Sequence, residues 1–237
     1  MPTTTDARDS AGNKLLAKLP REDFERILPH LKPVSFKLGE VVYESGGQME
    51  HIYFPTTAII SLLYTMENGS SAEMGVAGPE GLVGIALFMG GDTTPNRAVV
   101  QGAGGAVRMP AGVLRGEFGR GGPFQRLLLR YTQALITQMS QTAVCNRLHT
   151  VEQQLCRWLL LMRDRLGADE IVMTQELIAN MLGVRREGVT VAAGRLQEQG
   201  LISYVRGRIR ILDRRGLEAA VCECYRVVRD EYDRLLG

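Results

Sequence analysis

One glycine between two short amphipathic segments constrains this chain more than any other feature. Residues 174–196 read TQELIANMLGVRREGVTVAAGRL, with Thr174 at the start and Gly183 in the middle. Glycine adopts a left-handed turn at low cost, so Gly183 predicts the end of a first helix, on which Leu177, Ile178 and Met181 face inward. The second helix is expected to bury one stripe, namely Val189, Ala192, Ala193 and Leu196. The pattern predicts a helix-turn-helix.

The other face of the second helix carries the residues Arg185, Arg186, Glu187 and Thr190. An arginine can donate to two guanine acceptors at once, and a glutamate can accept from a cytosine amino group. Helices that enter the major groove of DNA place such residues at their start. A helical hairpin with a charged surface is the alternative, and it explains the glycine and the small residues less well.

Two short strands, Leu201–Val205 and Arg208–Leu212, are expected around Gly207. Arg208 and Arg210 alternate with isoleucines, so both arginines share one face, as in a wing that contacts phosphates. Residues 185–215 hold eight arginines and three acids, a local net charge of +5, although the whole chain carries only +2. Such a basic patch is typical of a polyanion-binding surface, with a solvated arginine-rich surface as the alternative.

Seven short β-branched runs separated by turn residues precede this region. Asn68-Gly69 is a hairpin signal between two of the runs. This series of short strands separated by turns predicts an antiparallel sandwich or jelly roll. The runs are 34–36, 41–43, 52–54, 58–64, 72–76, 98–101 and 106–109, and Asn13–Leu31 before them is expected to be helical, with an interruption at Pro20 and a stop at Pro29.

A glycine-rich hinge, Gly116–Gly122, and then a long helix that starts at Pro123 are expected after the strands. Apolar and small residues on this helix alternate three and four apart, which indicates a heptad seam for a second copy of the chain. The alternative is a core helix without a dimer role. The predicted seam residues are Leu128, Tyr131, Leu135, Gln138 and Thr142, followed by Cys145.

A break is expected near Asn146–Thr150, where Thr150 and Gln153 form a capping box for the next helix, which ends near Gly167. After the wing, residues 214–237 are expected to form a helical extension that packs on the winged domain or binds a partner. Cys222 and Cys224 would then point about 200° apart on that helix.

The four cysteines do not indicate a disulfide framework, and none has C-x-x-C spacing. Reduced, partly buried thiols are the expected state, with a metal or redox site as the alternative. The three histidines, His30, His51 and His149, join no acid or cysteine cluster in the sequence, so no metal ligands are predicted.

No apolar run is long enough to span a membrane, and the first residues do not look like a secretory leader. The expected location is therefore the cytoplasm, without a membrane partner. No nucleophile–base pair or phosphate loop is recognisable, so an enzyme is not predicted.

The order of these elements resembles the Crp/Fnr family, which includes the catabolite activator protein. Residues 36–46, FKLGEVVYESG, look like the first strands of the family's effector domain, and Arg186-Glu187-Gly188-Val189 is similar to its Arg-Glu-Thr-Val signature. The resemblance implies an α+β fold with an N-terminal antiparallel β-roll, a long dimerisation helix and a C-terminal winged helix-turn-helix. The expected boundaries are a disordered tail at 1–13, the β-roll at 14–118, the dimerisation helix at 119–148, the winged domain at 149–213 and the extension at 214–237.

The chain departs from the family at the effector pocket. Cyclic-nucleotide-binding members carry Gly-Glu-Leu and then Arg-Ser/Thr-Ala, whereas here Ile85 follows Gly84, and Asn96-Arg97-Ala98 stands at the second motif. An unpaired ligand hydroxyl costs about 1–3 kcal/mol, so cyclic AMP is not expected as a tight effector. The chain has no cysteine before Cys145, so the family's N-terminal iron–sulfur cluster is not expected, and haem has no support beyond His51. No cofactor is predicted, and the candidate pocket residues are Glu80, Gly84, Ile85, Asn96 and Arg97.

The sequence therefore predicts a homodimeric, non-enzymatic DNA-binding transcription factor whose β-roll senses an unidentified signal and which contacts RNA polymerase. Val191, where the family has a second base-reading arginine, predicts a different operator. It also supports the alternative of a ligand- or partner-binding regulator with weakened DNA binding. The predicted contacts to double-stranded DNA are Thr174, Gln175, Arg185, Arg186, Glu187, Thr190, Arg195, Arg206 and Arg208.

Overall fold

The computed structural model describes residues 12–237, and the chain forms two compact units. The first comprises the described residues up to Leu62 together with Val76–Leu135 and Leu235–Gly237; the second comprises Leu63–Gly75 and Ile136–Arg234. Among the described residues, no helix is both long and apolar enough to cross a membrane.

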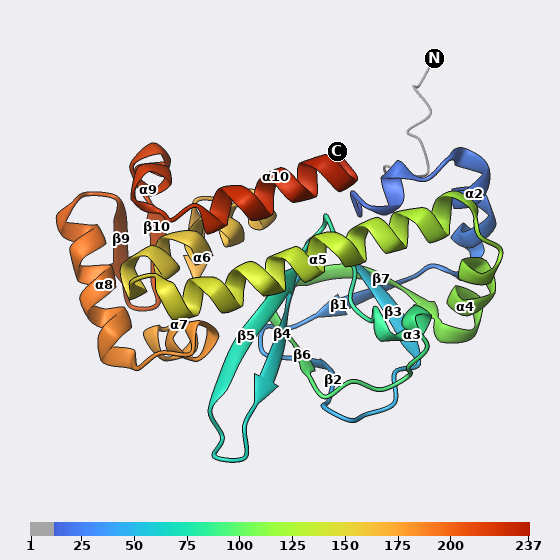
Figure 1. The fold of residues 1–237 in the computed structure, drawn as a ribbon, viewed down its shortest axis with the longest axis horizontal. Helices are drawn as coiled ribbons and strands as arrows, with labels where there is room; N and C mark the ends of the chain where they lie inside the picture. The colour runs from blue at the N-terminus through green and yellow to red at the C-terminus, as the bar shows by residue number, and fades with distance from the viewer. Residues whose placement is uncertain (1–11) are drawn as a thin grey trace. The chain divides into compact units, whose positions relative to one another are not determined.

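Strands from the seven predicted runs build two antiparallel sheets of a β-roll (Figure 1). One sheet has the order β1-β7-β3 and the other β2-β6-β4-β5. Gly69, at a φ of 83°, lies in the turn between β4 and β5 and confirms the predicted hairpin. The strands are β1 (Lys32–Phe36), β2 (Val41–Tyr43), β3 (His51–Pro55), β4 (Ile59–Thr65), β5 (Ser71–Ala77), β6 (Arg97–Gly102) and β7 (Gly104–Pro110).

Alternation along the strands produces the core of the roll. Ile52 and Phe54 on β3 are fully buried, as are Ile60 on β4 and Met109 on β7. Gly104 is required at the edge of β7, because a Cβ there would lie 2.6 Å from the backbone nitrogen of Ala58. The roll therefore has the tight packing that a half-buried alternating pattern predicts.

The N-terminal helix is shorter and more broken than predicted. It consists of η1 (Leu16–Lys18), α2 (Arg21–Ile27) and η2 (Leu28–His30), with Pro20 as the N-cap of α2. Of the predicted disordered tail, residues 1–11 lie outside the described residues. Asn13 does not belong to such a tail, because it is buried and donates to the carbonyls of Pro55 and Gly81 at 2.7 and 2.9 Å.

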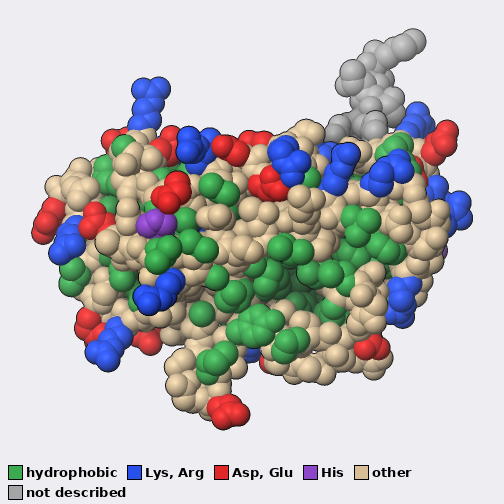
Figure 2. All heavy atoms as spheres, in the orientation of Figure 1, with side chains coloured by type: hydrophobic (Ala, Val, Ile, Leu, Met, Phe, Trp, Pro, Cys, Tyr) green, Lys and Arg blue, Asp and Glu red, His purple; other side chains and the backbone are tan. Residues whose placement is uncertain are grey.

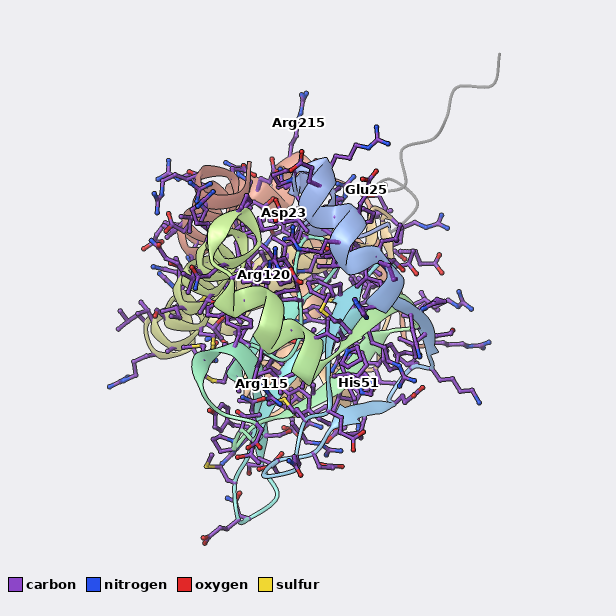
Figure 3. The ribbon with its side chains drawn as sticks, turned by 90° about the vertical axis from the view of Figure 1, so that its right-hand side faces the viewer. Asp23, Glu25, His51, Arg115, Arg120 and Arg215 are labelled. Atoms are coloured by element: carbon purple, nitrogen blue, oxygen red, sulfur yellow. The ribbon has the colours of Figure 1, made fainter. Side chains whose placement is uncertain are left out.

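The predicted glycine hinge is wrong in extent, because α4 (Ala111–Gly119) includes two of its glycines. Only Arg120 and Gly121 separate α4 from α5 (Gly122–Leu148), and Gly121 adopts a φ of 75°. Glu117 on α4 pairs with Arg26 of α2 at 2.7 Å. Figure 3 looks onto this end of the unit, where the labelled Asp23 belongs to α2 and the labelled Arg120 directly follows α4.

In the second unit, the end of α5 is followed by α6 (Val151–Leu166), whose capping box of Thr150 and Gln153 is confirmed. Gly167 ends α6 in the left-handed conformation, as predicted. The sequence did not predict β8 (Glu170–Val172), which pairs with β10 and makes the wing three-stranded, in the order β8-β10-β9. The other elements are α7 (Gln175–Leu182), α8 (Arg186–Glu198), β9 (Ile202–Val205), β10 (Arg208–Ile211), α9 (Arg214–Ala220) and α10 (Cys224–Leu236).

The C-terminal extension is helical, but it is not one helix. Residues 221–223 separate α9 from α10, so Cys222 lies in the break and Cys224 begins the next helix. The helical geometry that would point these two thiols about 200° apart does not apply there.

Candidate functional site

The helix-turn-helix has the predicted geometry. Thr174 caps α7 by accepting from the backbone of Leu177 at 3.3 Å, and Gly183 ends α7 with a φ of 66°. The predicted inward position of Leu177 is wrong, because its side chain is 39% exposed. The stripe of α8 predicted to face the core is buried as expected: Val189, Ala192, Ala193 and Leu196.

The opposite face of α8 is exposed at its N-terminal end. Arg185 is the N-cap, and Arg186 and Glu187 form the first turn. Thr190 donates its hydroxyl hydrogen toward Gln175 Oε1 at 2.8 Å, which links α8 to the start of α7. The backbone N–H groups at the start of an α-helix have no partner within the helix, so this helix end with its two arginines makes a surface that favours anions.

Arg195 and Val191 occupy the next turns of α8. Arg195 is exposed, with its Nη1 3.7 Å from Glu152 Oε2, so its guanidinium is partly directed toward α6. Val191 is 54% exposed, and its side chain has no hydrogen-bonding group. The charged side chains of this face therefore concentrate in the first turn of α8.

The wing presents its arginines on one face, as the alternation predicted. Ile209 and Ile211 are buried while Arg208 and Arg210 are exposed. Both arginines approach Glu170 of β8, at 2.7 and 3.5 Å, and the hydrogen bond from Arg208 lowers the pKa of Glu170. Arg206, in the turn before Gly207, has a φ of 49°, a conformation that is uncommon for a residue other than glycine.

The predicted dimer seam on α5 is wrong, because all five of its residues are buried within the chain. Tyr131 donates to the carbonyl of Leu82 at 2.9 Å, and a Cβ on Gly81 would lie 2.6 Å from the ring. Gln138 and Thr142 accept from arginines of α6, Arg165 at 2.7 Å and Arg157 at 3.0 Å. Leu128 and Leu135 are fully buried core residues.

A different set of residues is exposed along α5. Leu129 and Ile136 are 49% and 53% exposed, and Figure 2 shows hydrophobic side chains gathered over the ribbon of this helix. The exposed positions follow one another four and three apart, which is heptad spacing. We call them the α5 stripe: Leu129, Gln133, Ile136, Ser140 and Ala143.

Among the described residues, the predicted effector residues contact different partners. Glu80 Oε1 accepts from the backbone of Gly78 at 3.3 Å in a turn, and Ile85 caps α3 (Ala86–Met89) after the left-handed Gly84. Asn96 accepts from the hydroxyl of Tyr43 at 2.7 Å, and Arg97 pairs with Glu44 at 3.2 Å.

A hollow of about 220 Å³ in the β-roll was missed by the sequence analysis. His51, labelled in Figure 3, lies in it, and burial followed by the charge of Arg108 lowers the pKa of its imidazole. None of the five predicted effector residues is among the described residues that line this hollow. Its lining residues are Val42, Tyr43, Gln48, Met49, Glu50, His51, Tyr53 and Arg108.

Three cysteines and one histidine converge in the second unit, which the sequence analysis did not predict. Cys145 lies in the last turn of α5 and His149 directly follows that helix, while Cys222 lies just before α10 and Cys224 is its first residue. The prediction that His149 joins no cysteine cluster is wrong. The hydrogen bond between Cys145 and Cys222 raises the pKa of the first thiol and lowers that of the second. The remaining cysteine, Cys156, is buried on α6, and burial raises its pKa to about 12.

Two family models match the chain. The cyclic nucleotide-binding domain matches residues 33–119, and the Crp-like helix-turn-helix domain matches residues 153–220. No curated protein matches the chain in sequence.

Solved structures with the same fold include transcription regulators. FixK2 from Bradyrhizobium japonicum is 18% identical with a TM-score of 0.70, over 81% of this chain and 98% of its own. A putative regulator of the Crp/Fnr family from Eubacterium rectale is 18% identical with a TM-score of 0.69, over 87% and 96%. The c-di-GMP responsive global regulator CLP from Xanthomonas campestris is 15% identical with a TM-score of 0.67, over 82% and 100%.

Proposed function

Because this chain belongs to the Crp/Fnr family of transcription regulators, we propose that it binds double-stranded DNA as a homodimer and reads the operator with α8. Membership of a family of non-enzymatic regulators agrees with the sequence prediction that the chain is not an enzyme. The observation that supports the reading role most directly is the exposed first turn of α8, where Arg185, Arg186 and Glu187 stand on a helix whose other face is buried.

Each predicted DNA contact has its own role in the proposal. Arg186 and Glu187 read base edges, because a major-groove helix presents its first residues to the bases. Thr174 and Gln175 lie beside them at the start of α7 and contact the phosphate backbone, while Thr190 and Arg185 orient this end of the helix. The wing residues Arg206 and Arg208 contact phosphates. Arg195 also contacts a phosphate, once its ion pair with Glu152 is broken.

The α5 stripe is the proposed dimer contact in place of the buried seam. Leu129 and Ile136 lie seven residues apart and Ala143 follows at the same interval, so a second copy of α5 can pack against them in a two-fold arrangement. A two-fold dimer presents two copies of α8 to one duplex.

The proposed signal is not cyclic AMP. Ile85 has no hydrogen-bonding side chain, and Asn96, at the position of the second motif's arginine, is engaged with Tyr43 at 2.7 Å. Titration calorimetry of the full chain with cyclic AMP should show no binding at micromolar concentration. Micromolar binding would refute this part of the proposal. RNA polymerase as a partner and the cytoplasm as the location remain proposals that follow from family membership.

Footprinting on genomic fragments selected by the protein tests the proposed function. We expect protection of two half-sites whose centres are one helical turn, about 34 Å, apart. Protection of a single half-site, or binding that shows no preference among the fragments, would contradict the proposed dimeric reader.

A further inference from the structure

Cys145, His149, Cys222 and Cys224 have the composition and the geometry of a metal site. Their ligand atoms all lie within 4.8 Å of one another. Three sulfurs and one imidazole nitrogen are a ligand set that Zn²⁺ takes in structural sites. We propose that these four residues bind one Zn²⁺ ion tetrahedrally, which ties the start of α10 to the end of α5.

The distances between the ligand atoms fit a single ion. With Zn–S near 2.3 Å and Zn–N near 2.0–2.1 Å, two ligands of a tetrahedral ion lie about 3.8 Å apart for a sulfur pair and about 3.6 Å apart for sulfur and nitrogen. The structure has 3.6 Å between Cys145 Sγ and Cys222 Sγ, and 3.5 Å between Cys224 Sγ and His149 Nδ1. An iron–sulfur cluster would hold its cysteines farther apart, because irons and sulfides fill the space between them.

The backbone around the four residues directs them to one point. His149 directly follows α5, and its backbone N–H donates to the carbonyl of Cys145 at 3.0 Å. The helical turn therefore continues to His149, and both side chains lie on the same face. Cys222 lies in the break between α9 and α10, and this break is what lets it turn toward the same point as Cys224. Gln154, itself buried, donates to the carbonyl of His149 at 3.0 Å and braces the end of α5.

The second ring nitrogen of His149 faces a carboxylate. Glu223 Oε2 lies 3.5 Å from His149 Nε2, while Nδ1 faces Cys224. A metal-bound histidine commonly turns its other nitrogen to a carboxylate, which fixes the tautomer and strengthens the ligand. Glu223 is therefore a positioning residue of the site.

The charges around the cluster also suit the ion. Three thiolates and Zn²⁺ together carry one negative charge. Arg157 is 4% exposed, and in the described part of the chain its Nε has no hydrogen-bond partner while one Nη donates to Thr142. Its charge acts on both Cys145 and Cys224, so the buried guanidinium would balance an anionic metal site.

The surroundings indicate a structural ion rather than a catalytic one. The three cysteines are 0–4% exposed and Val221 packs against them, so four protein ligands would close the coordination shell. A surface hollow of about 250 Å³, lined in part by Val221, Cys222 and Glu223, borders the cluster.

Metal analysis of the full chain, purified in thiol reductant without chelator, tests the proposal. We expect one zinc per chain, loss of zinc in Cys145→Ser and Cys224→Ser, and retention in Cys156→Ser, which removes a buried cysteine outside the cluster. A wild-type chain that neither contains nor takes up zinc would overturn the proposal. Equal zinc in Cys224→Ser and wild type would also overturn it.

Two further measurements keep the proposal falsifiable if a cysteine variant does not fold. Replacement of zinc by Co²⁺ in the wild-type chain should give the strong visible bands of a tetrahedral ion with thiolate charge transfer, whereas the weak spectrum of a six-coordinate ion would contradict the site. Glu223→Gln should lower zinc affinity by about 10- to 100-fold, the usual effect of an outer-shell partner. The matched control Glu198→Gln, on α8, should leave affinity unchanged, and equal affinities in both variants would remove Glu223 from the site.

Discussion

The candidate residues of α8 and of the β-roll differ in their surroundings. On α8, Arg185, Arg186 and Glu187 are exposed, on a helix anchored by a buried stripe. In the roll, Asn96 is engaged with Tyr43, Arg97 pairs with Glu44, and Ile85 has no hydrogen-bonding side chain. Both regions match the model of their family domain, so a match to a fold does not by itself establish that the side chains needed for a function are presented.

The largest effect is expected from a charge in the α5 stripe, which would uncouple the two copies of α8. Ile136→Glu would bury two like charges at the two-fold contact and destabilise the dimer by about 3–5 kcal/mol. Analytical ultracentrifugation should then show a monomer, and footprinting should show no paired half-sites.

Met89→Glu is the matched control for that change, because it places the same charge on an equally exposed apolar residue of α3. It should remain dimeric. A dimeric Ile136→Glu protein would place the interface elsewhere.

A second change should sharpen the reading role of α8 itself. Val191→Arg restores an arginine at an exposed position one turn after Glu187, and a bidentate contact to guanine contributes about 1–3 kcal/mol of discrimination. Selection of bound sequences should give the variant a preference for an additional guanine in each half-site. An unchanged preference would mean that this position does not face the bases.

Changes in the wing should have a smaller effect on DNA affinity, and this effect should not depend on the DNA sequence. Arg208→Ala removes one phosphate contact and should reduce the slope of log affinity against log salt by about 1. Glu170→Gln should act in the opposite direction, because it releases Arg208 and Arg210 from their ion pairs. Equal salt slopes for all three proteins would exclude the wing from the interface.

The smallest expected effect concerns stability. Gly188 lies inside α8 with ordinary helical backbone, and a Cβ there would meet Val151 at 3.8 Å, which is normal contact. Gly188→Ala should therefore stabilise the protein by about 0.5–1 kcal/mol. Thermal unfolding measures this, and a destabilised variant would contradict the described packing.

Elements that repeat regularly were predictable from the sequence. The seven strands, the capping box at Thr150 and the buried stripe of α8 follow from periodicity and from local capping chemistry. The α5 stripe was not predictable in the same way. Two apolar faces run along α5. The hydrogen bond from Tyr131 to the carbonyl of Leu82 shows that the face with more apolar residues belongs to the core.

The cysteine cluster was missed for a related reason. The sequence pattern predicts one continuous helix after the wing, and the break at residues 221–223 interrupts it without a proline or glycine to mark the position. Its partner residues, Cys145 and His149, are more than seventy positions earlier in the chain. Such a meeting depends on tertiary packing, which spacing along the sequence does not reveal.

The reading role of α8 is tested most directly by comparing Arg186→Ala with Arg115→Ala, an exposed arginine of α4. Affinity is measured for the selected operator and for random DNA at the same salt concentration. We expect Arg186→Ala to lose about 1–3 kcal/mol of binding free energy on the operator and much less on random DNA, while Arg115→Ala matches the wild type on both. An Arg186→Ala protein that keeps the full ratio of specific to non-specific affinity would contradict the claim that α8 reads the bases.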